Sequence, residues 1–185
     1  MPHPVTQSDI LGALESNAAT IARLFSDLPD ARLFIGDSDR WGPAHHLVHL
    51  TRTSLAIQRG LRSGTLPPCA AKRLRTYAEV RDAATGSLAS TPKDRLLEMG
   101  RVVALEPGAT REDLVRAFTS ASADLRAAAA AWDERDLDRY AMRHPLIGEL
   151  SVREMLFFCI VHERHHERRV RVILEADTAR DSASP

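Results

Sequence analysis

The stretch TREDLVRAFTSASADLRAAAAAWDER, residues 110–135, contains the clearest helical pattern in the chain. Its apolar residues recur at alternating intervals of four and three positions, which places them on one side of an α-helix. They are Leu114, Phe118, Ala121, Leu125, Ala128 and Trp132. Thr110, followed three residues later by Asp113, is a capping-box pattern that marks the start of a helix. An apolar stripe with this spacing is typical of a helix that packs in a bundle.

The same periodicity, together with similar start signals, predicts four more helices. They cover about residues 8–28, 43–60, 76–90 and 152–175. The second of them has Gly42 as a possible N-cap and Pro43 as its first residue, a combination that favours the start of a helix. No alternating β pattern of useful length appears in the chain. We therefore expect an all-α four-helix bundle with one short accessory helix.

Length and composition limit the class of protein. The 185 residues are enough for one domain, which we place at residues 1–176, followed by a polar tail at residues 177–185. Lys and Arg together number 25, as do Asp and Glu, so no basic excess points to nucleic acid or to an anionic membrane. Two unpatterned cysteines, Cys69 and Cys159, and the lack of a signal peptide or long apolar run predict a cytoplasmic protein that does not span a membrane.

Three histidines occur within five residues of the last predicted helix, near the end of the chain, in FCIVHERHHERRV at residues 158–170. His162 and His166 are four positions apart and share the apolar side of that helix, so both are expected to face the interior of the bundle. Two imidazoles one turn apart can bind a single metal ion. His165 is expected to point toward solvent, among neighbouring arginines.

The second predicted helix supplies candidates for a third ligand. The stretch AHHLVHL, residues 44–50, contains His45, His46 and His49. Helical periodicity puts His46 slightly closer to the apolar stripe than His49, but it does not decide between them. Buried imidazoles need partners for their nitrogens. A metal ion would meet that need, and the alternative is that one C-terminal histidine is a hydrogen-bonded core residue while the other lies at the edge.

The sequence His162-Glu163-x-x-His166 also matches the HExxH motif, in which two histidines bind zinc and the glutamate is the general base of a protease. The extended motif of the metzincins requires Gly and His where this chain has Arg169 and Val172. Only 19 residues follow His166, which leaves no room for the downstream helix that carries a ligand glutamate in other proteases of this class. We therefore do not expect a metalloprotease.

Two motifs connect the predicted helices to a known family. Trp41 is followed eight residues later by His49, which belongs to an HL pair. The stretch HPLIGELSVREMLFFCIVHERHH, residues 144–166, joins an HP-x-x-G-x-L-S turn to a helix with an H-x-x-x-H pattern. Together with the order of the helices, these motifs resemble the DinB/YfiT-like superfamily of metal-binding helical bundles. In this resemblance Trp41 and the turn with Pro145 and Gly148 have structural roles, because they determine where two helices begin.

The resemblance implies a three-histidine metal site formed by His49, His162 and His166, and so it selects His49 over His46. His45 and His46 are then expected near the entrance of the site. The resemblance also implies a bound Zn²⁺ or Ni²⁺ ion whose coordination is completed by water, and a homodimer. Three nitrogen ligands with one open position are typical of catalytic rather than structural zinc sites.

Characterised members of the superfamily include thiol S-transferases, which activate a low-molecular-weight thiol, and a thiol-dependent isomerase. The function implied is therefore a metal-dependent thiol S-transferase, or a related detoxification enzyme or hydrolase, in which the metal holds the thiolate of a small cofactor. The alternative is a non-catalytic metal-binding or stress-response bundle in which the metal is structural.

Other residues of the last helix are also candidates for roles near the metal. Cys159 lies about one turn before the first histidine ligand and is either a lining residue or a small buried hydrophobe. Glu163 and Glu167 are expected to form salt bridges with nearby arginines, with the orientation of ligand imidazoles as the alternative. Arg168 could hold an anionic thiol, although a solvated position is the expectation.

Overall fold

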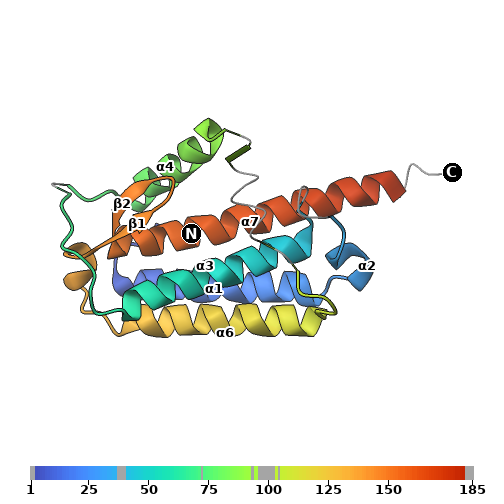
Figure 1. Cartoon of the computed structure of the whole chain (residues 1–185), viewed down its shortest axis with the longest axis horizontal. Coiled ribbons are helices and arrows are strands. Elements are labelled where there is room, and N and C mark those ends of the chain that lie inside the picture. The colour runs from blue at the N-terminus through green and yellow to red at the C-terminus, as the bar shows by residue number, and fades with distance from the viewer. Residues whose placement is uncertain are drawn as a thin grey trace.

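The computed structural model describes residues 3–36, 41–71, 73–92, 94–95, 103 and 105–181. Four long helices form its main body, and they are α1 (Gln7–Ser26), α3 (Pro43–Arg62), α6 (Arg111–Ala130) and α7 (Val152–Asp181). Helices α1 and α3 each pack against both α6 and α7, which closes the four into a bundle (Figure 1). The expectation of an all-α four-helix bundle is therefore confirmed.

Shorter elements lie around this bundle or connect its helices. They are α2 (Asp30–Leu33), α4 (Tyr77–Ser90), the 3₁₀ helix η1 (Asp136–Asp138), and the strands β1 (Ala141–His144) and β2 (Gly148–Ser151). Helix α4 is the predicted accessory helix, and it lies against the outside of α7 (Figure 1). The two strands lie at the N-terminal end of α7, so the hairpin and α4 cover the same half of that helix.

The two strands were not predicted from the sequence. They pair in antiparallel fashion, with His144 opposite Gly148 at the turn. Gly148 has a φ of 85°, a conformation that favours glycine, and the backbone N–H groups of Leu146 and Ile147 both donate to Nδ1 of His144 at 3.2 Å. Two four-residue strands are too short to display an alternating pattern, because a turn and a helix start occupy the residues around them.

The helix starts agree closely with the capping patterns. The hydroxyls of Thr76 and Thr110 each accept a hydrogen bond from the backbone three residues later, as a capping box requires. The helix ends agree less well, because α6 stops at Ala130 and α7 extends to Asp181, past its expected end near residue 175. Residues 182–185 of the predicted tail lie outside the described residues, and the proposed domain boundary stays a prediction.

The apolar core consists of two parts separated along the bundle. One part contains Ile10, Leu14, Ile57, Leu61, Leu125, Leu156 and Ile160, and the other contains Ile21, Phe25, Leu47, Leu50, Leu114, Phe118 and Val170. At the level between them, each long helix contributes at least one buried polar residue. These residues are Asn17, Ser54, Ser122, Glu163 and His166. Burial of polar groups is unfavourable unless they are paired, so this layer is the part of the bundle that packing alone does not explain.

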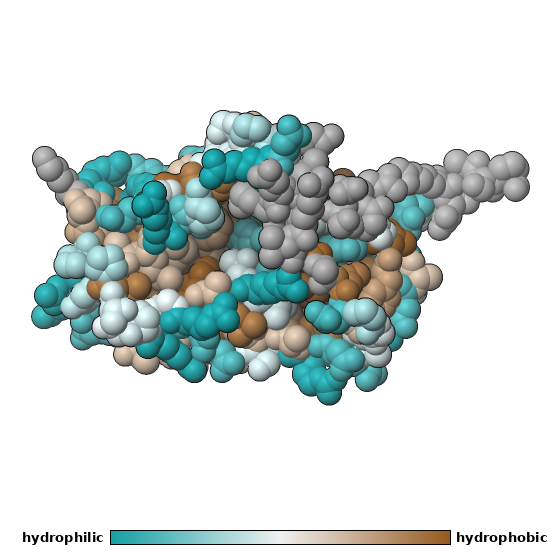
Figure 2. Space-filling view, in the orientation of Figure 1, coloured by the Kyte–Doolittle hydropathy of each residue, from teal (hydrophilic) through white to brown (hydrophobic). Residues whose placement is uncertain are grey.

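On the face seen in Figure 2, hydrophobic residues form separate patches among hydrophilic ones. Among the helices of the described residues, none has the length and apolar character needed to cross a membrane.

Candidate metal centre

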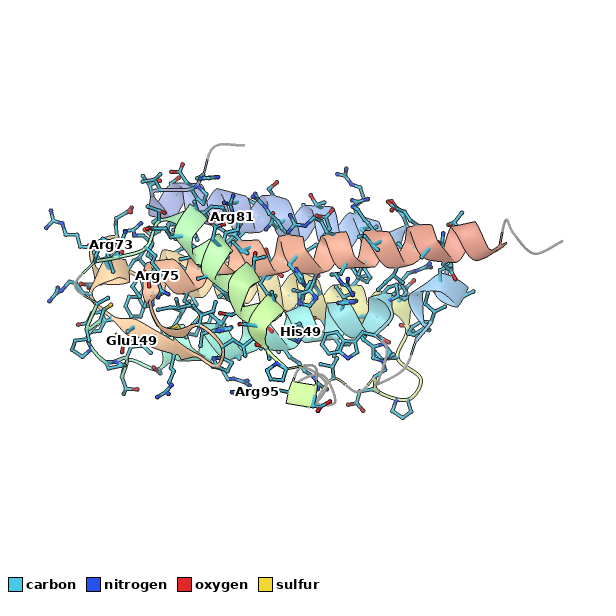
Figure 3. The ribbon with its side chains drawn as sticks, turned by 90° about the horizontal axis from the view of Figure 1, so that it is seen from above. His49, Arg73, Arg75, Arg81, Arg95 and Glu149 are labelled. Atoms are coloured by element: carbon cyan, nitrogen blue, oxygen red, sulfur yellow. The ribbon has the colours of Figure 1, made fainter. Side chains whose placement is uncertain are left out.

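Three histidines from two helices meet in one cluster. His49 comes from α3 (Figure 3), and His162 and His166 come from α7, one turn apart. The Nε2 atom of His162 is 2.9 Å from Nε2 of His49 and 3.0 Å from Nε2 of His166. The candidate ligand atoms of the three residues all lie within 4.8 Å of one another. The structure thus brings together the three residues that the resemblance selected.

The spacing of these nitrogens fits one small divalent ion. In a tetrahedral site with metal–nitrogen bonds of about 2.0–2.1 Å, two ligand nitrogens lie about 3.3 Å apart. The two Nε2–Nε2 distances of 2.9 and 3.0 Å are only a few tenths of an ångström shorter. A small outward movement of the rings therefore suffices to admit an ion.

The surroundings keep these imidazoles neutral. Burial, followed by the charge of His165, lowers the pKa of His49 to about 4. Burial also holds the pKa values of His162 and His166 well below the usual value for histidine, with a smaller contribution from the neighbouring histidines. A neutral imidazole has one nitrogen with a free lone pair, which is the form that binds a metal.

His46 lies in the same cluster but in a different role from His49. It is buried, and its Nδ1 is 2.8 Å from Nδ1 of His166, the nitrogen on the other side of that ring from the His162 contact. Burial, followed by the charge of His49, lowers the pKa of His46 to about 3. Periodicity correctly placed His46 closer to the interior. His49, in contrast, contacts Nε2 of His162 and belongs to the group of three candidate ligands.

Trp41 forms part of the wall of this cluster. Its ring centroid is 5.1 Å from that of His49, 5.3 Å from that of His46 and 6.4 Å from that of His166. From the sequence, Trp41 was expected only to have a role in starting the helix. Its spacing of five and eight residues from His46 and His49 was the available signal for this contact.

A second wall comes from the hairpin and the start of α7. Phe158 stacks on His162 with a centroid distance of 5.1 Å and an interplanar angle of 22°. His144 packs against the same phenylalanine at 4.2 Å, and burial lowers its pKa to about 4. The HP-x-x-G turn is therefore not only a helix start, because it also brings His144 next to the aromatic ring that covers a candidate ligand.

Glu163 points away from the cluster, toward α1. It is buried, and Nδ2 of Asn17 donates to its Oε2 at 3.1 Å. Burial raises the pKa of Glu163 to about 8, although the hydrogen bond from Asn17 opposes this shift. The prediction of a solvated salt bridge for Glu163 is therefore wrong. Its position also argues against a zincin-like general base, because the carboxylate of such a base must face the metal. Glu167 does form the expected kind of salt bridge, with Arg171 at 2.7 Å.

The remaining candidates do not join the cluster. Cys159 is buried in the apolar core, and burial raises the pKa of its thiol, so it behaves as a small hydrophobe. Arg168 is exposed and lines a groove of about 330 Å³ between α1 and α7, together with Glu163. His45 accepts a hydrogen bond from the Gly42 backbone N–H at 3.3 Å, which helps to begin α3.

His165 is partly exposed rather than fully solvated. Its ring meets that of His166 edge-on at a centroid distance of 5.2 Å, and burial together with the charges of Arg169 and Arg168 lowers its pKa. The ring of His165 therefore contacts the ring of the candidate ligand His166.

Within the described parts of the chain, the only group of three metal-binding side chains close enough to share an ion is the one formed by His49, His162 and His166. A three-nitrogen set that leaves one position for an outside ligand can present that ligand for reaction.

Comparison with known proteins adds one match. A family model described as the DinB superfamily matches residues 13–168, which include every candidate ligand and most of the bundle. No curated protein and no solved structure matches the chain.

Proposed function

The chain belongs to the DinB superfamily, and we propose that it is a metal-dependent enzyme that joins a low-molecular-weight thiol to an electrophile. Support comes from the convergence of His49, His162 and His166 on one point, with no fourth ligand grouped with them among the described residues. Such a site leaves room for a ligand from outside the protein. Zn²⁺ or Ni²⁺ suits three imidazole nitrogens.

In this proposal the three histidines hold the ion, and the residues around them shape its surroundings. A divalent ion in this position lowers the pKa of a bound thiol, so that the thiolate is available near neutral pH. Trp41 and Phe158 lie against the ligand rings and reduce the access of water. Exclusion of water strengthens the attraction between the site and an anionic sulfur.

The proposed transfer needs no redox partner. The sulfur forms a bond to the electrophilic carbon while the bond between that carbon and its leaving group breaks, and the thiol proton is released to solvent. Cys159 is too deeply buried to be the nucleophile, because burial raises the pKa of its thiol. In this proposal the sulfur comes from a small molecule.

Metal analysis combined with an activity panel tests this proposal. We expect about one divalent ion per chain in protein purified without chelator, and metal-dependent turnover with at least one pairing of a small thiol and an electrophile. His49→Ala should lose both metal and turnover. The matched control is His165→Ala, which removes a histidine next to the site and should retain the metal. Stoichiometric metal in His49→Ala would contradict the site.

The alternative is a non-catalytic bundle in which the ion joins α3 to α7 and stabilises the fold. It is favoured by the contact of His49 on α3 with His162 on α7, because an ion held there would join the two helices. In that case His49→Ala would strongly lower the melting temperature. The metal-loaded wild type would not turn over any of the tested pairs of thiol and electrophile.

We further propose a homodimer that functions in the cytoplasm and consists of one domain, residues 1–176, with a tail at residues 177–185. Two free cysteines support a reducing compartment, and the homodimer rests on the resemblance to the superfamily. Light scattering should give twice the chain mass of 20.5 kDa. Limited proteolysis should remove only the tail, and cell fractionation should recover the protein with cytoplasmic markers.

A further inference from the structure

His46 lies directly behind one of the three candidate ligands. Its Nδ1 is 2.8 Å from Nδ1 of His166, while Nε2 of His166 is 3.0 Å from Nε2 of His162. Both nitrogens of the His166 ring are therefore in contact with another histidine. A ring held at both nitrogens cannot rotate without breaking a contact.

The contact between the two Nδ1 atoms also determines where the proton of His166 lies. Two nitrogens 2.8 Å apart share one hydrogen, so one ring donates and the other accepts. If His166 is to offer the Nε2 lone pair to a metal, its proton must be on Nδ1. His166 then donates to His46, and His46 carries its own proton on Nε2.

His46 is well placed to act as a permanent acceptor. It is 6% exposed, so its ring does not exchange this contact for water. Trp41 meets the His46 ring edge-on, with centroids 5.3 Å apart and an interplanar angle of 79°. His46 also precedes His49 by three residues in α3, so one helical turn carries both a ligand and the residue behind another ligand.

We infer that His46 is a positioning residue, which holds His166 in the Nδ1–H tautomer and fixes the orientation of its ring toward the metal. The inference rests on the proposed metal site. Residues that orient a ligand imidazole through its second nitrogen typically change metal affinity by about 10–100-fold when they are replaced. His46 is therefore expected to contribute to affinity without binding the ion.

The first test uses the metal-free wild-type protein. Long-range ¹H–¹⁵N spectra of the histidine rings report which nitrogen carries the proton, and the signals of His166 are assigned by their loss in His166→Ala. We expect the proton of His166 on Nδ1 and the proton of His46 on Nε2. A His166 proton on Nε2 would overturn the inference, and this outcome does not depend on the folding of any variant at position 46.

The second test measures metal affinity by competition with a coloured chelator. His46→Phe keeps a ring of similar size but has no acceptor, and we expect its Kd for Zn²⁺ to rise about 10–100-fold with one ion still bound per chain. His46→Gln restores an acceptor oxygen, and its Kd should return to within about threefold of the wild-type value. The control is His165→Phe, because His165 touches His166 only by its ring, and its Kd should match that of the wild type.

Two results would overturn the inference in this second test. An unchanged Kd in His46→Phe would mean that the contact does not position the ligand. Loss of the ion from His46→Phe, as from His166→Ala, would make His46 a ligand itself. Failure of the proposed function is distinguishable from both, since it would appear as a wild-type protein that binds no divalent ion.

Discussion

Replacement of Glu154 by Gln is expected to lower the free energy of unfolding by about 2–4 kcal/mol. The Glu154 carboxylate is 1% exposed at the start of α7, where it accepts hydrogen bonds from Arg75 through the backbone N–H at 2.6 Å, Nε at 3.1 Å and Nη2 at 3.0 Å. It also accepts a hydrogen bond from the Ser151 backbone N–H at 2.9 Å. This one carboxylate thus ties the segment before α4 to the junction between β2 and α7.

The magnitude follows from the burial of the two partners. Removal of one partner of a buried ion pair costs about 3–5 kcal/mol. The side chain of Arg75 is 27% exposed, so part of its charge is hydrated again once the pair is broken, and the lower part of that range applies. The amide of the introduced glutamine also retains one acceptor oxygen. For a chain of this length, a loss of about 3 kcal/mol lowers the melting temperature by about 6–12 °C.

The effect should depend on pH. Burial raises the pKa of Glu154, but the hydrogen bonds from Arg75 and Ser151 outweigh it and hold the pKa below the ordinary value of 4.5. The stabilisation is therefore complete above that ordinary value and is lost as the pH falls toward the lowered pKa of the folded state. The difference between wild type and variant should be largest near neutral pH and should shrink in acid.

Urea unfolding of chelator-treated protein at pH 7 and in acid measures both effects. A double-mutant cycle with Arg75→Leu should give a coupling energy above about 1 kcal/mol, because two hydrogen bonds join the two side chains directly. The control is Glu149→Gln, since the exposed Glu149 side chain accepts a hydrogen bond from the Ala70 backbone N–H at 3.1 Å, and its loss should cost less than about 1 kcal/mol. A loss below about 1 kcal/mol at pH 7 in Glu154→Gln would refute the reasoning.

Three further substitutions test the site and its supports. His162→Ala removes the ring whose Nε2 contacts both other candidate ligands. Metal analysis should therefore find no stoichiometric ion, and the melting temperature with metal should fall to that of the chelated wild type. A full complement of metal would contradict this. Glu163→Gln should keep the rate of any metal-dependent turnover within about threefold of the wild-type rate, because the carboxyl faces Asn17. A hundredfold loss in the steady-state rate would instead assign Glu163 to catalysis. Gly42→Ala would place a Cβ 1.6 Å from the Ile35 carbonyl oxygen, and we expect urea unfolding to show a loss above about 2 kcal/mol; a neutral effect would show that the two backbones are not in contact.

Features that depend on neighbouring residues were predictable from the sequence. Helix starts at Thr76 and Thr110 follow from hydrogen bonds that span three residues, and the apolar stripe of α6 follows from the helical repeat. The same repeat placed His162 and His166 on one side of α7, one turn apart. These properties need no knowledge of the other helices, because the geometry of a single helix determines them.

Features that depend on how the helices pack were decided only by the tertiary structure. Periodicity could not choose between His46 and His49, because their contacts depend on how far α3 is displaced along α7 and how it is rotated. The distances of 2.8 Å for His46 and 2.9 Å for His49 show that both reach α7, but at different nitrogens and different partners. The burial of Glu163 against Asn17 has the same origin, since the position of α1 determines which side of α7 is covered.

The sequence by itself therefore determined the four long helices and α4, their order and the pair of histidines on α7, because these follow from local hydrogen bonds and the 3.6-residue repeat. The tertiary structure decided which residues surround that pair, including Trp41 and His144. Side chains more than a hundred residues apart meet only after the apolar faces of several helices have packed, and the register of that packing depends on all of them together.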